Sequence, residues 1–388
     1  MRFFRSIFIV VPVCIFLMLC SREGKDFPKL TELRGVWLTN VDSRVLDSRE
    51  SISEAMQFLA EHHFNIVFPV VWNDAKTLYP SQVMEELFGF PIDPRFAGRD
   101  PLQEVIEEAH SRDIAVIPWF EYGFAASFQK NGGMILQKKP EWSARDINGG
   151  LLTKNGFEWM NGYHPEVQNF LLSLILEVVR NYDVQGIQGD DRLPAQPVEG
   201  GYSSYTIDRY MKEQNEKYPP AYEQDSDWML WRADILNEFA GKVYREVKKI
   251  KPDMYVSWAP SIYPWSYDEY LQDWPAWVLQ GNGDIIHPQV YRYSIQEYRS
   301  SLDSIPGKTL LGRSPDSLIY PGVLMNVGDY VISPEFLLQA VAYNREKGYR
   351  GEVFFFYEGL RKNGDQLADS LKATWYREPA RLPFEWKR

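Results

Sequence analysis

The chain has 388 residues, which is enough for one large α/β domain or two smaller ones with an ample core. Its net charge of -11, with no block of like charges, argues against a nucleic-acid partner. Aromatic residues make up 15% of the chain, which favours a large core and, where Trp and Tyr follow strands, stacking on sugar rings.

The first twenty residues predict a targeting segment. Arg2 and Arg5 form a basic start, and the apolar run that follows is short for a bilayer span. The run closes with Leu17-Met18-Leu19-Cys20, which resembles the lipobox of bacterial lipoproteins. Leu19 departs from the small residue that usually precedes the lipidated Cys. An ordinary secretory signal and an uncleaved anchor are the alternatives.

We therefore expect residues 1–20 to be a lipoprotein signal peptide, with Cys20 as the lipidated residue, and residues 21–32 to be a tether. The mature protein would be anchored to a membrane and face the periplasm or the cell exterior. Cys14 and Cys20 are the two cysteines of the chain. We therefore expect no disulfide and no cysteine-based metal site in the folded part.

From residue 33 onward, short apolar runs alternate with amphipathic stretches, which predicts alternating strands and helices. The predicted strands are Arg34–Thr39, Ile66–Val71, Ala115–Phe120, Gly186–Asp190, Tyr255–Ala259, Ile285–Tyr291, Thr309–Gly312 and Glu352–Tyr357. The predicted helices include Ser51–His63, Pro101–Arg112, Pro165–Arg180, Trp228–Ile250, Ile295–Ser304 and Pro334–Lys347. Asp100-Pro101 and Ser333-Pro334 each combine an N-cap residue with Pro at the first helical position.

Eight strands alternating with helices predict a (β/α)₈ TIM barrel, which we place at residues 33–376, followed by a surface tail at 377–388. Links from helix to strand are short, whereas links from strand to helix are long, as in residues 72–99 and 121–164. Such one-sided elaboration is typical of a barrel enzyme with its site at the C-terminal ends of the strands. A doubly wound open sheet is the alternative, but no Gly-rich dinucleotide turn supports it.

Three of the apolar runs end in a carboxylate, at Glu121, Asp190 and Glu358. The C-terminal ends of the strands in a barrel share one rim, so we expect these acids there. Hydrolysis of a glycosidic bond requires a protonated carboxylic acid at the leaving oxygen and a carboxylate near the anomeric carbon. The three acids therefore indicate a carboxylate-driven enzyme.

Asp190 is the strongest candidate for the ionised carboxylate, because its strand resembles the fourth strand of several barrel glycosidases. Glu121 ends the neighbouring third strand and is the favoured proton donor, since like charge and burial should raise its pKa. Asp191 is a further catalytic candidate, although it could instead pair with Arg192. Glu358 is the competing acid or a group that binds sugar hydroxyls.

Polar and aromatic residues at the strand ends are expected to line the rim and bind the substrate. These residues are Asn40, Trp72, Asn73, Trp119, Arg192, His287, Gln289 and Tyr291. A structural role is the alternative for several of them. A His before Pro in an apolar run is usually a core residue, and single aromatic residues are more often buried than stacked on a sugar.

An anionic glycan would need local basic residues such as Arg192, Arg292 and Arg313. The five histidines show no metal-ligand spacing. A carboxylate-only metal site at Asp190 and Asp191 has no further support in the sequence. We therefore expect no metal and no cofactor.

Several motifs cover almost the whole predicted domain and are long enough to be specific. They are Arg34–Asn40, Phe68–Asn73, Leu78–Ser81, Pro118–Gly123, Gly186–Arg192, Ile286–Arg292 and Phe355–Glu358. Together they resemble the bacterial glycosyl-hydrolase-like family 10. Its members are TIM-barrel proteins, often lipoproteins, and include a division-associated enzyme that cuts peptidoglycan glycan strands stripped of their peptides. Gly189 departs from the bulky apolar residue usual in the family, which implies a wider end of the fourth strand.

The sequence thus predicts a glycoside hydrolase of the bacterial cell envelope, with peptidoglycan glycan strands as the expected substrate. Its partners would be this glycan and a membrane, reached through the lipid anchor. A non-catalytic glycan-binding lipoprotein on the same scaffold and a glycan lyase are the alternatives. An enzyme would lose turnover in Asp190→Ala but keep its affinity, and a lyase would release an unsaturated or anhydro sugar.

The predicted lipidation is tested by Cys20→Ser. The variant should leave the membrane fraction or keep an unprocessed signal, because the thiol that carries the lipid is gone. Membrane fractionation and mass spectrometry of the N-terminus measure this. An unlipidated N-terminus in the parent protein, with unchanged fractionation of the variant, contradicts the prediction.

Overall fold

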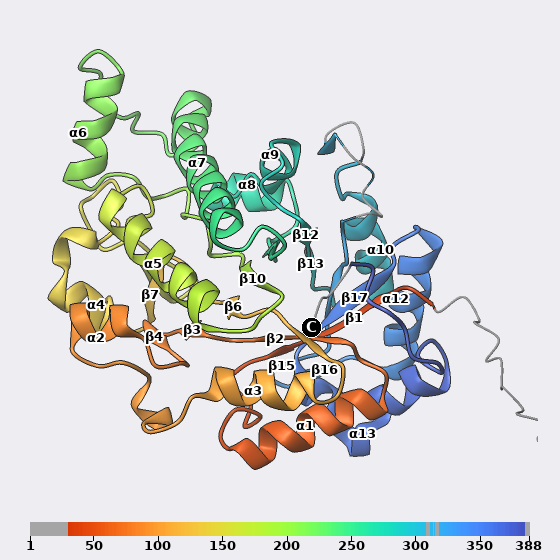
Figure 1. The fold of residues 1–388 in the computed structure, drawn as a ribbon. Helices are drawn as coiled ribbons and strands as arrows, with labels where there is room; N and C mark the ends of the chain where they lie inside the picture. The colour runs from red at the N-terminus through yellow and green to blue at the C-terminus, as the bar shows by residue number, and fades with distance from the viewer. Residues whose placement is uncertain (1–29, 308–310, 313, 315–317, 385–388) are drawn as a thin grey trace, which may run out of the picture.

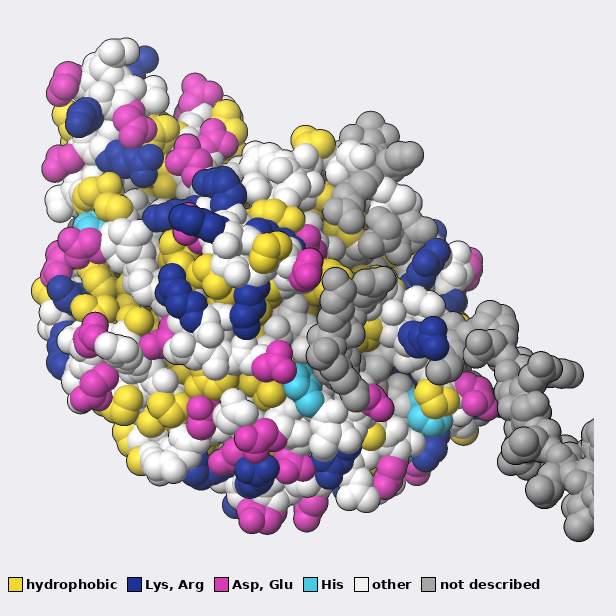
Figure 2. All heavy atoms as spheres, viewed as in Figure 1, with side chains coloured by type: hydrophobic (Ala, Val, Ile, Leu, Met, Phe, Trp, Pro, Cys, Tyr) yellow, Lys and Arg dark blue, Asp and Glu magenta, His cyan; other side chains and the backbone are white. Residues whose placement is uncertain are grey.

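The computed structural model describes residues 30–307, 311–312, 314 and 318–384. Cys20, the predicted signal peptide and most of the predicted tether lie outside this described part. Among the helices of the described part, none is both long enough and apolar enough to cross a membrane. On the face shown in Figure 2, acidic and basic side chains are interspersed.

The core is built from parallel strands in two sheets, ordered β13-β14-β17-β1-β2-β5 and β12-β11-β10-β6. These strands are β1 (Leu33–Leu38), β2 (Ile66–Pro69), β5 (Ala115–Val116), β6 (Trp119–Phe120), β10 (Gly186–Gly189), β11 (Tyr255–Trp258), β12 (Ile285–Ile286), β13 (Gln289–Val290), β14 (Gly322–Leu324) and β17 (Gly351–Phe355). Their residues are buried with few exceptions, as expected for a parallel sheet covered by helices.

Two prolines explain why the core divides into two sheets. Pro118 separates β5 from β6, and Pro288 separates β12 from β13. Proline lacks the N–H that a strand donates, so the ladder is interrupted at each of them. β5 pairs with β2 and β6 with β10, while β12 pairs with β11 and β13 with β14. The pairings thus run around a ring, and the predicted (β/α)₈ TIM barrel is confirmed.

Helices surround the strands (Figure 1). They are α1 (Arg49–Glu61), α2 (Gln82–Phe88), α3 (Pro101–His110), α4 (Gly133–Lys138), α5 (Pro165–Asn181), α6 (Ser204–Glu213), α7 (Ser226–Ile250), α8 (Trp265–Tyr270), α9 (Trp274–Leu279), α10 (Ile295–Asp303), α12 (Pro334–Glu346) and α13 (Tyr357–Ala373). The six helices predicted from periodicity are confirmed within a few residues. Asp100 and Ser333 cap α3 and α12 as predicted, each accepting a hydrogen bond from a first-turn N–H.

Additional short strands lie in the links that follow barrel strands. These are β3 (Trp72–Asn73), β4 (Lys76–Thr77), β7 (Ala125–Phe128), β8 (Thr153–Lys154), β9 (Phe157–Trp159), β15 (Asn326–Val327) and β16 (Tyr330–Val331). The link after β10 contains α6, which projects from the barrel beside the start of α7 (Figure 1). The elaboration therefore lies after the strands, at the C-terminal end of the barrel.

The predicted seventh strand is wrong. Of Thr309–Gly312, Thr309 and Leu310 lie outside the described residues, and Leu311 is helical. β14 takes this place instead, pairing with β13 and β17. Pro321 and Gly322 look like a turn in the sequence, whereas here the proline directly precedes the strand and Gly322 packs against Trp37.

The eighth strand also ends earlier than predicted. β17 stops at Phe355, and α13 begins at Tyr357. Glu358 therefore lies in the first turn of a helix and not at the end of a strand.

A buried polar network closes the N-terminal end of the barrel. Glu352 on β17 accepts hydrogen bonds from Tyr376 and Arg345, and Arg345 also pairs with Glu32 at 3.3 Å. The fully buried Arg34 pairs with Glu32 at 2.9 Å. Backbone bonds at 2.8 and 2.9 Å join residues 30–32 to Arg381. This part of the predicted tail thus packs on the barrel, at the end opposite to the acids.

Candidate active site

Glu121 and Asp190 lie next to each other on the C-terminal rim. Each directly follows a strand, β6 for Glu121 and β10 for Asp190. The two strands pair in parallel, with Gly189 opposite Phe120, so the next residues along are neighbours. The barrel register therefore brings together the two acids that the sequence predicts as a pair.

Arg192 links three carboxyl groups through one guanidinium. Its Nη2 lies 3.1 Å from Asp190 Oδ2 and 3.8 Å from Glu121 Oε1, and its Nη1 lies 3.1 Å from Asp191 Oδ1. Its Nε donates to the backbone carbonyl of Glu121 at 3.1 Å. Asp191 therefore belongs to the same cluster, and Arg192 pairs with its acids.

Gly123 allows the loops after β6 and β10 to approach each other. Its φ of +48° lies in the left-handed region, and a Cβ there would come within 2.1 Å of the carbonyl oxygen of Arg192. That same oxygen accepts a hydrogen bond from Phe124 N at 3.0 Å. A glycine at this position is thus required to hold Arg192 against Glu121.

Asp190 is fixed by side chains from strand β13 and from the loop after α8. Gln289 Nε2 donates to Asp190 Oδ1 at 2.8 Å, and Gln272 Nε2 donates to the backbone carbonyl of Asp190 at 3.0 Å. With Arg192 on Oδ2, both carboxyl oxygens of Asp190 accept a hydrogen bond from nitrogen. This is the arrangement that favours an ionised carboxylate.

Among the described residues, Glu121 accepts a hydrogen bond on one carboxyl oxygen only. Asn73 Nδ2 donates to its Oε2 at 2.5 Å. The other oxygen, Oε1, is the one 3.8 Å from Arg192, beyond hydrogen-bond distance. Glu121 can therefore carry a proton on Oε1 without losing the bond from Asn73, as a proton donor must.

Burial dominates the electrostatics of the cluster. It raises the pKa of Asp190 well above its usual value, and the charge of Asp191 adds to this, while Arg192 opposes it. Burial also raises the pKa of Glu121, against the opposing charge of Arg192 and the hydrogen bond from Asn73. Burial and the charge of Asp191 therefore favour a protonated carboxyl group in the cluster, and the charge of Arg192 opposes this.

The raised pKa of Glu121 agrees with the sequence-based expectation. The role of Asp190 as the ionised partner stays a prediction, because burial (3% exposed) and the adjacent Asp191 both raise its pKa. The hydrogen bonds favour the charge on Asp190 and the proton on Glu121.

Glu358 has a different environment from the other acids. Its Oε1 accepts hydrogen bonds from Ser43 Oγ at 2.5 Å and from Arg44 N at 3.0 Å. Both donors belong to the loop between β1 and α1. The structure thus assigns Glu358 the anchoring of this loop, and no ion pair with Arg192 is formed.

Two predicted substrate-binding residues are core residues here. His287 is fully buried, its Nδ1–H donates to the carbonyl of Tyr320 at 2.9 Å, and burial lowers its pKa to about 3. Trp72 is also fully buried and donates from Nε1 to the carbonyl of Gly123 at 3.0 Å. Because both side chains are fully buried, neither presents a surface to a sugar.

Tyr291 is influenced by the charges of the acids. Burial raises the pKa of its hydroxyl well above the usual value, and the charge of Asp190 is the next cause. Its ring is stacked on Phe355 with 5.2 Å between centroids. Trp119 packs on the same Phe355 ring, and its Nε1 is buried without a hydrogen-bond partner among the described residues, as is Asn40 Oδ1.

The structure adds residues that the sequence did not single out. Gln188 lies inside the barrel, where its Oε1 accepts from Trp37 Nε1 at 2.7 Å and its Nε2 donates to Ser257 Oγ at 2.9 Å. It is part of the Gly186–Arg192 motif, so its place two residues before Asp190 could have identified it from the sequence. Gln272 has no such signal, since it follows α8 outside every motif.

The expected widening at Gly189 is wrong. A Cβ at this position would lie 2.5 Å from the ring of Trp258 on the adjacent strand β11. Trp258 is fully buried and fills the space that a bulky residue at position 189 would take. The space at the end of β10 is therefore filled by a side chain of β11 and not by one of β10.

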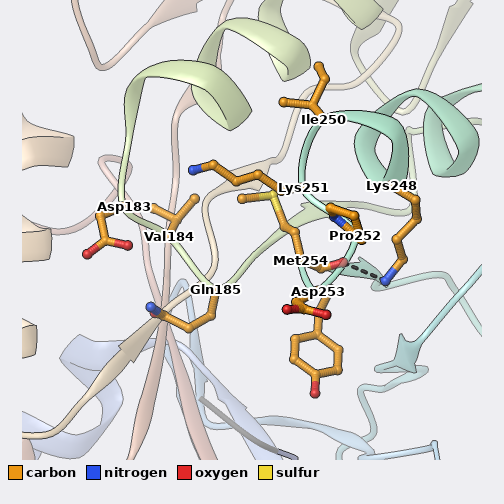
Figure 3. Close-up of a pocket in the computed structure, with 10 residues that line it drawn as sticks. Asp183, Val184, Gln185, Lys248, Ile250, Lys251, Pro252, Asp253 and Met254 are labelled. Atoms are coloured by element: carbon orange, nitrogen blue, oxygen red, sulfur yellow. Dashed lines mark hydrogen bonds between the residues drawn. The ribbon is translucent and has the colours of Figure 1, made fainter. Parts of the chain in front are cut away.

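A pocket at the opposite end of the barrel contains none of these acids. It lies before β10 and β11 and is lined by residues such as Asp183, Gln185, Lys248 and Tyr255 (Figure 3). Lys248 donates to the carbonyl of Met254 within it. Among the described residues, no group of three or more His, Cys, Asp or Glu side chains is arranged to hold a metal ion.

Comparison with known proteins identifies the family. Residues 32–309 match the family model described as glycosyl hydrolase-like 10. The chain belongs to this family. Glycosyl hydrolase DigH of Escherichia coli strain K12 is 26% identical over 336 residues, which cover 72% of this chain and 74% of the relative. Glycosyl hydrolase YngK of Bacillus subtilis is 25% identical, with 91% of this chain and 73% of the relative covered.

Solved structures show the same fold at low identity. The glycoside hydrolase domain of PgaB (BpsB) from Bordetella bronchiseptica aligns with a TM-score of 0.62 and 12% identity, covering 88% of this chain and 98% of that domain. The catalytic domain of β-amylase from Paenibacillus polymyxa aligns with a TM-score of 0.61 and 10% identity, covering 90% and 99%. Both support the barrel fold found here.

The assignment of the proton donor is tested by Glu121→Gln and Glu358→Gln. Glu121→Gln should lower turnover by about 10²–10⁴-fold, because an amide cannot donate the proton to the leaving oxygen. It should also remove the high-pH limb of the rate profile, where the wild-type cluster loses this proton. Glu358→Gln should lower turnover much less, since the partners of Glu358 are a loop hydroxyl and a backbone amide. Near-normal turnover of Glu121→Gln with loss in Glu358→Gln would show that Glu358 is the donor.

Proposed function

We propose that the protein is a glycoside hydrolase of the bacterial cell envelope that cleaves glycosidic bonds in peptidoglycan glycan strands. The observation that carries the reaction class is the cluster of Glu121, Asp190 and Asp191 on one buried guanidinium. Two carboxyl groups with different hydrogen bonding are what general acid catalysis and charge stabilisation of an oxocarbenium-like state require. Membership of a glycosyl hydrolase-like family supports the same class.

The proposed reaction uses the two acids in distinct roles. Glu121 gives its proton to the glycosidic oxygen, and the bond from that oxygen to the anomeric carbon breaks. Asp190 stays ionised and stabilises the positive charge that develops at this carbon. A water molecule then supplies the hydroxyl group of the new reducing end, and its second proton returns to the carboxylates. The different hydrogen bonds to the two acids favour the charge on Asp190 and the proton on Glu121.

The choice of peptidoglycan rests on indirect support. The predicted lipoprotein signal would place the barrel in the envelope, where this glycan is abundant. The relatives named glycosyl hydrolase in Escherichia coli and Bacillus subtilis are bacterial proteins of the same family.

The proposal is tested by hydrolysis of peptide-free peptidoglycan strands by the full-length protein in detergent. Wild type should release new reducing ends, and Asp190→Asn should lower the rate by about 10³-fold or more, since the developing charge loses its counter-charge. Asp183→Asn is the matched control, because Asp183 is 89% exposed in its side chain and lies at the other end of the barrel. Circular dichroism of each variant verifies folding.

Two results would contradict the proposal. Binding of the strands by wild type without any reducing ends would indicate a glycan-binding protein. Products with an unsaturated or anhydro sugar would indicate a lyase, because a hydrolase adds water across the bond it breaks.

A further inference from the structure

A second polar cluster lies beside the acids, at the ends of β13 and β14. Arg292 and Tyr293 directly follow β13, while Asn326 and Tyr330 belong to the β15–β16 hairpin that follows β14. β13 and β14 pair in parallel, so these residues lie on the same rim as Asp190. The rings of Tyr293 and Tyr330 meet edge to face, with 4.8 Å between centroids. We call these four residues the β13–β14 cluster.

Arg292 is a cation without an acid partner in the described part of the chain. Its Nη1 donates to the carbonyl of Tyr291 at 2.7 Å, and it forms no ion pair with a carboxylate of the described residues. Arg192, in contrast, is surrounded by three acids. Arg292 is half-buried, and this burial lowers its pKa, against the charge of Glu297. A partly desolvated guanidinium of this kind gains from an anionic ligand.

The cluster also contains polar atoms that lack a partner. Asn326 Oδ1 and Tyr330 OH are buried, and neither forms a hydrogen bond within the described residues. Buried polar atoms are nearly always satisfied, so these two indicate a ligand with hydroxyl or amide hydrogens. Tyr293 is 63% exposed and presents an aromatic face of the kind on which sugar rings stack.

β13 connects this cluster to the catalytic acids. Gln289 on β13 donates to Asp190, and Tyr291, two residues later, is influenced by the charges of Asp190, Asp191 and Glu121. Arg292 follows Tyr291 directly. From Gln289 to Arg292 the chain advances about 10 Å. One glycan chain can therefore contact the acids and the cluster together.

We propose that the β13–β14 cluster is a subsite for an acidic sugar, in which Arg292 pairs with a carboxylate carried by the glycan. This inference rests on the proposed function and narrows its substrate. Muramic acid in peptide-free strands has a free lactyl carboxylate, whereas strands with peptides have an amide at that position. Uronic acids offer the same carboxylate. The overall charge of -11 repels polyanions at a distance, so a local cation is needed to select them.

The test measures binding in the Asp190→Asn background, so that strands stay intact. The full-length protein is titrated, with tryptophan fluorescence as the signal, against peptide-free peptidoglycan strands. A second arm uses the same strands after conversion of their carboxylates to methylamides, and a third uses a polyuronate. We expect the native strands to bind about tenfold or more tightly than the methylamide strands, as one charge-assisted pair provides.

Variants of Arg292 then show whether this residue recognises the carboxylate of the glycan. Adding Arg292→Gln should bring the ratio of the two Kd values close to one, and Arg292→Lys should retain most of the preference because it keeps the charge. Arg299→Gln is the matched control, since Arg299 is an exposed arginine on α10 and should leave the ratio as it is.

Equal binding of native and methylamide strands, or a preference that survives Arg292→Gln, overturns the subsite. Binding of the polyuronate alone, lost in Arg292→Gln, supports the subsite but makes a uronic acid its ligand. Absence of hydrolysis by wild type overturns the proposed function separately, because the Kd ratio is measured without turnover.

Discussion

The interaction on which this site depends is the shared guanidinium of Arg192. It contacts Asp190 and Asp191 at 3.1 Å and approaches Glu121 to 3.8 Å. Burial opposes the charge of Arg192, yet the nearby acids together raise its pKa, so it stays protonated. Because three acids share one cation, burial and like charge raise the pKa of Asp190 and of Glu121. The same charge balance therefore favours a protonated acid beside an ionised carboxylate, as glycoside hydrolysis requires.

The barrel separates this site from the interactions that stabilise the fold. The N-terminal end is closed by Arg34, Arg345, Glu32 and Glu352, and the chain segments on both sides of the barrel meet there. The acids stand at the other end, on loops held by Gly123 and Gln272. Substitutions of the acids should accordingly affect chemistry more than stability, whereas loss of one partner in the N-terminal network leaves a buried charge uncompensated.

Much of this arrangement could be predicted from the sequence, because apolar runs and helix starts are local signals. The strands that end at Glu121 and Asp190 were found from composition, and parallel pairing then made the two acids neighbours. The strand at Gly322–Leu324 was missed, since it is short and follows Pro321. Val323 of this strand is buried. The segment is a strand because it fills the position between β13 and β17, which the local sequence does not reveal.

The sequence also could not separate structural from functional side chains at the rim. His287, Trp72 and Tyr291 all follow the same pattern, but the first two are fully buried, whereas Tyr291 is influenced by the charges of the acids. Glu358 ends an apolar run as Glu121 does, but a one-residue gap before α13 turns it toward Ser43. Such differences depend on packing between distant segments, which no local pattern contains.

The role of Arg192 is tested most directly by the pH dependence of hydrolysis in Arg192→Gln and Arg192→Lys. The guanidinium lowers the pKa of both Asp190 and Glu121. Its removal in Arg192→Gln should therefore move both limbs of the rate profile to higher pH, while Arg192→Lys, which keeps a charge, should shift them less. Circular dichroism confirms that both variants fold. Profiles of the two variants that coincide with that of wild type would contradict the account.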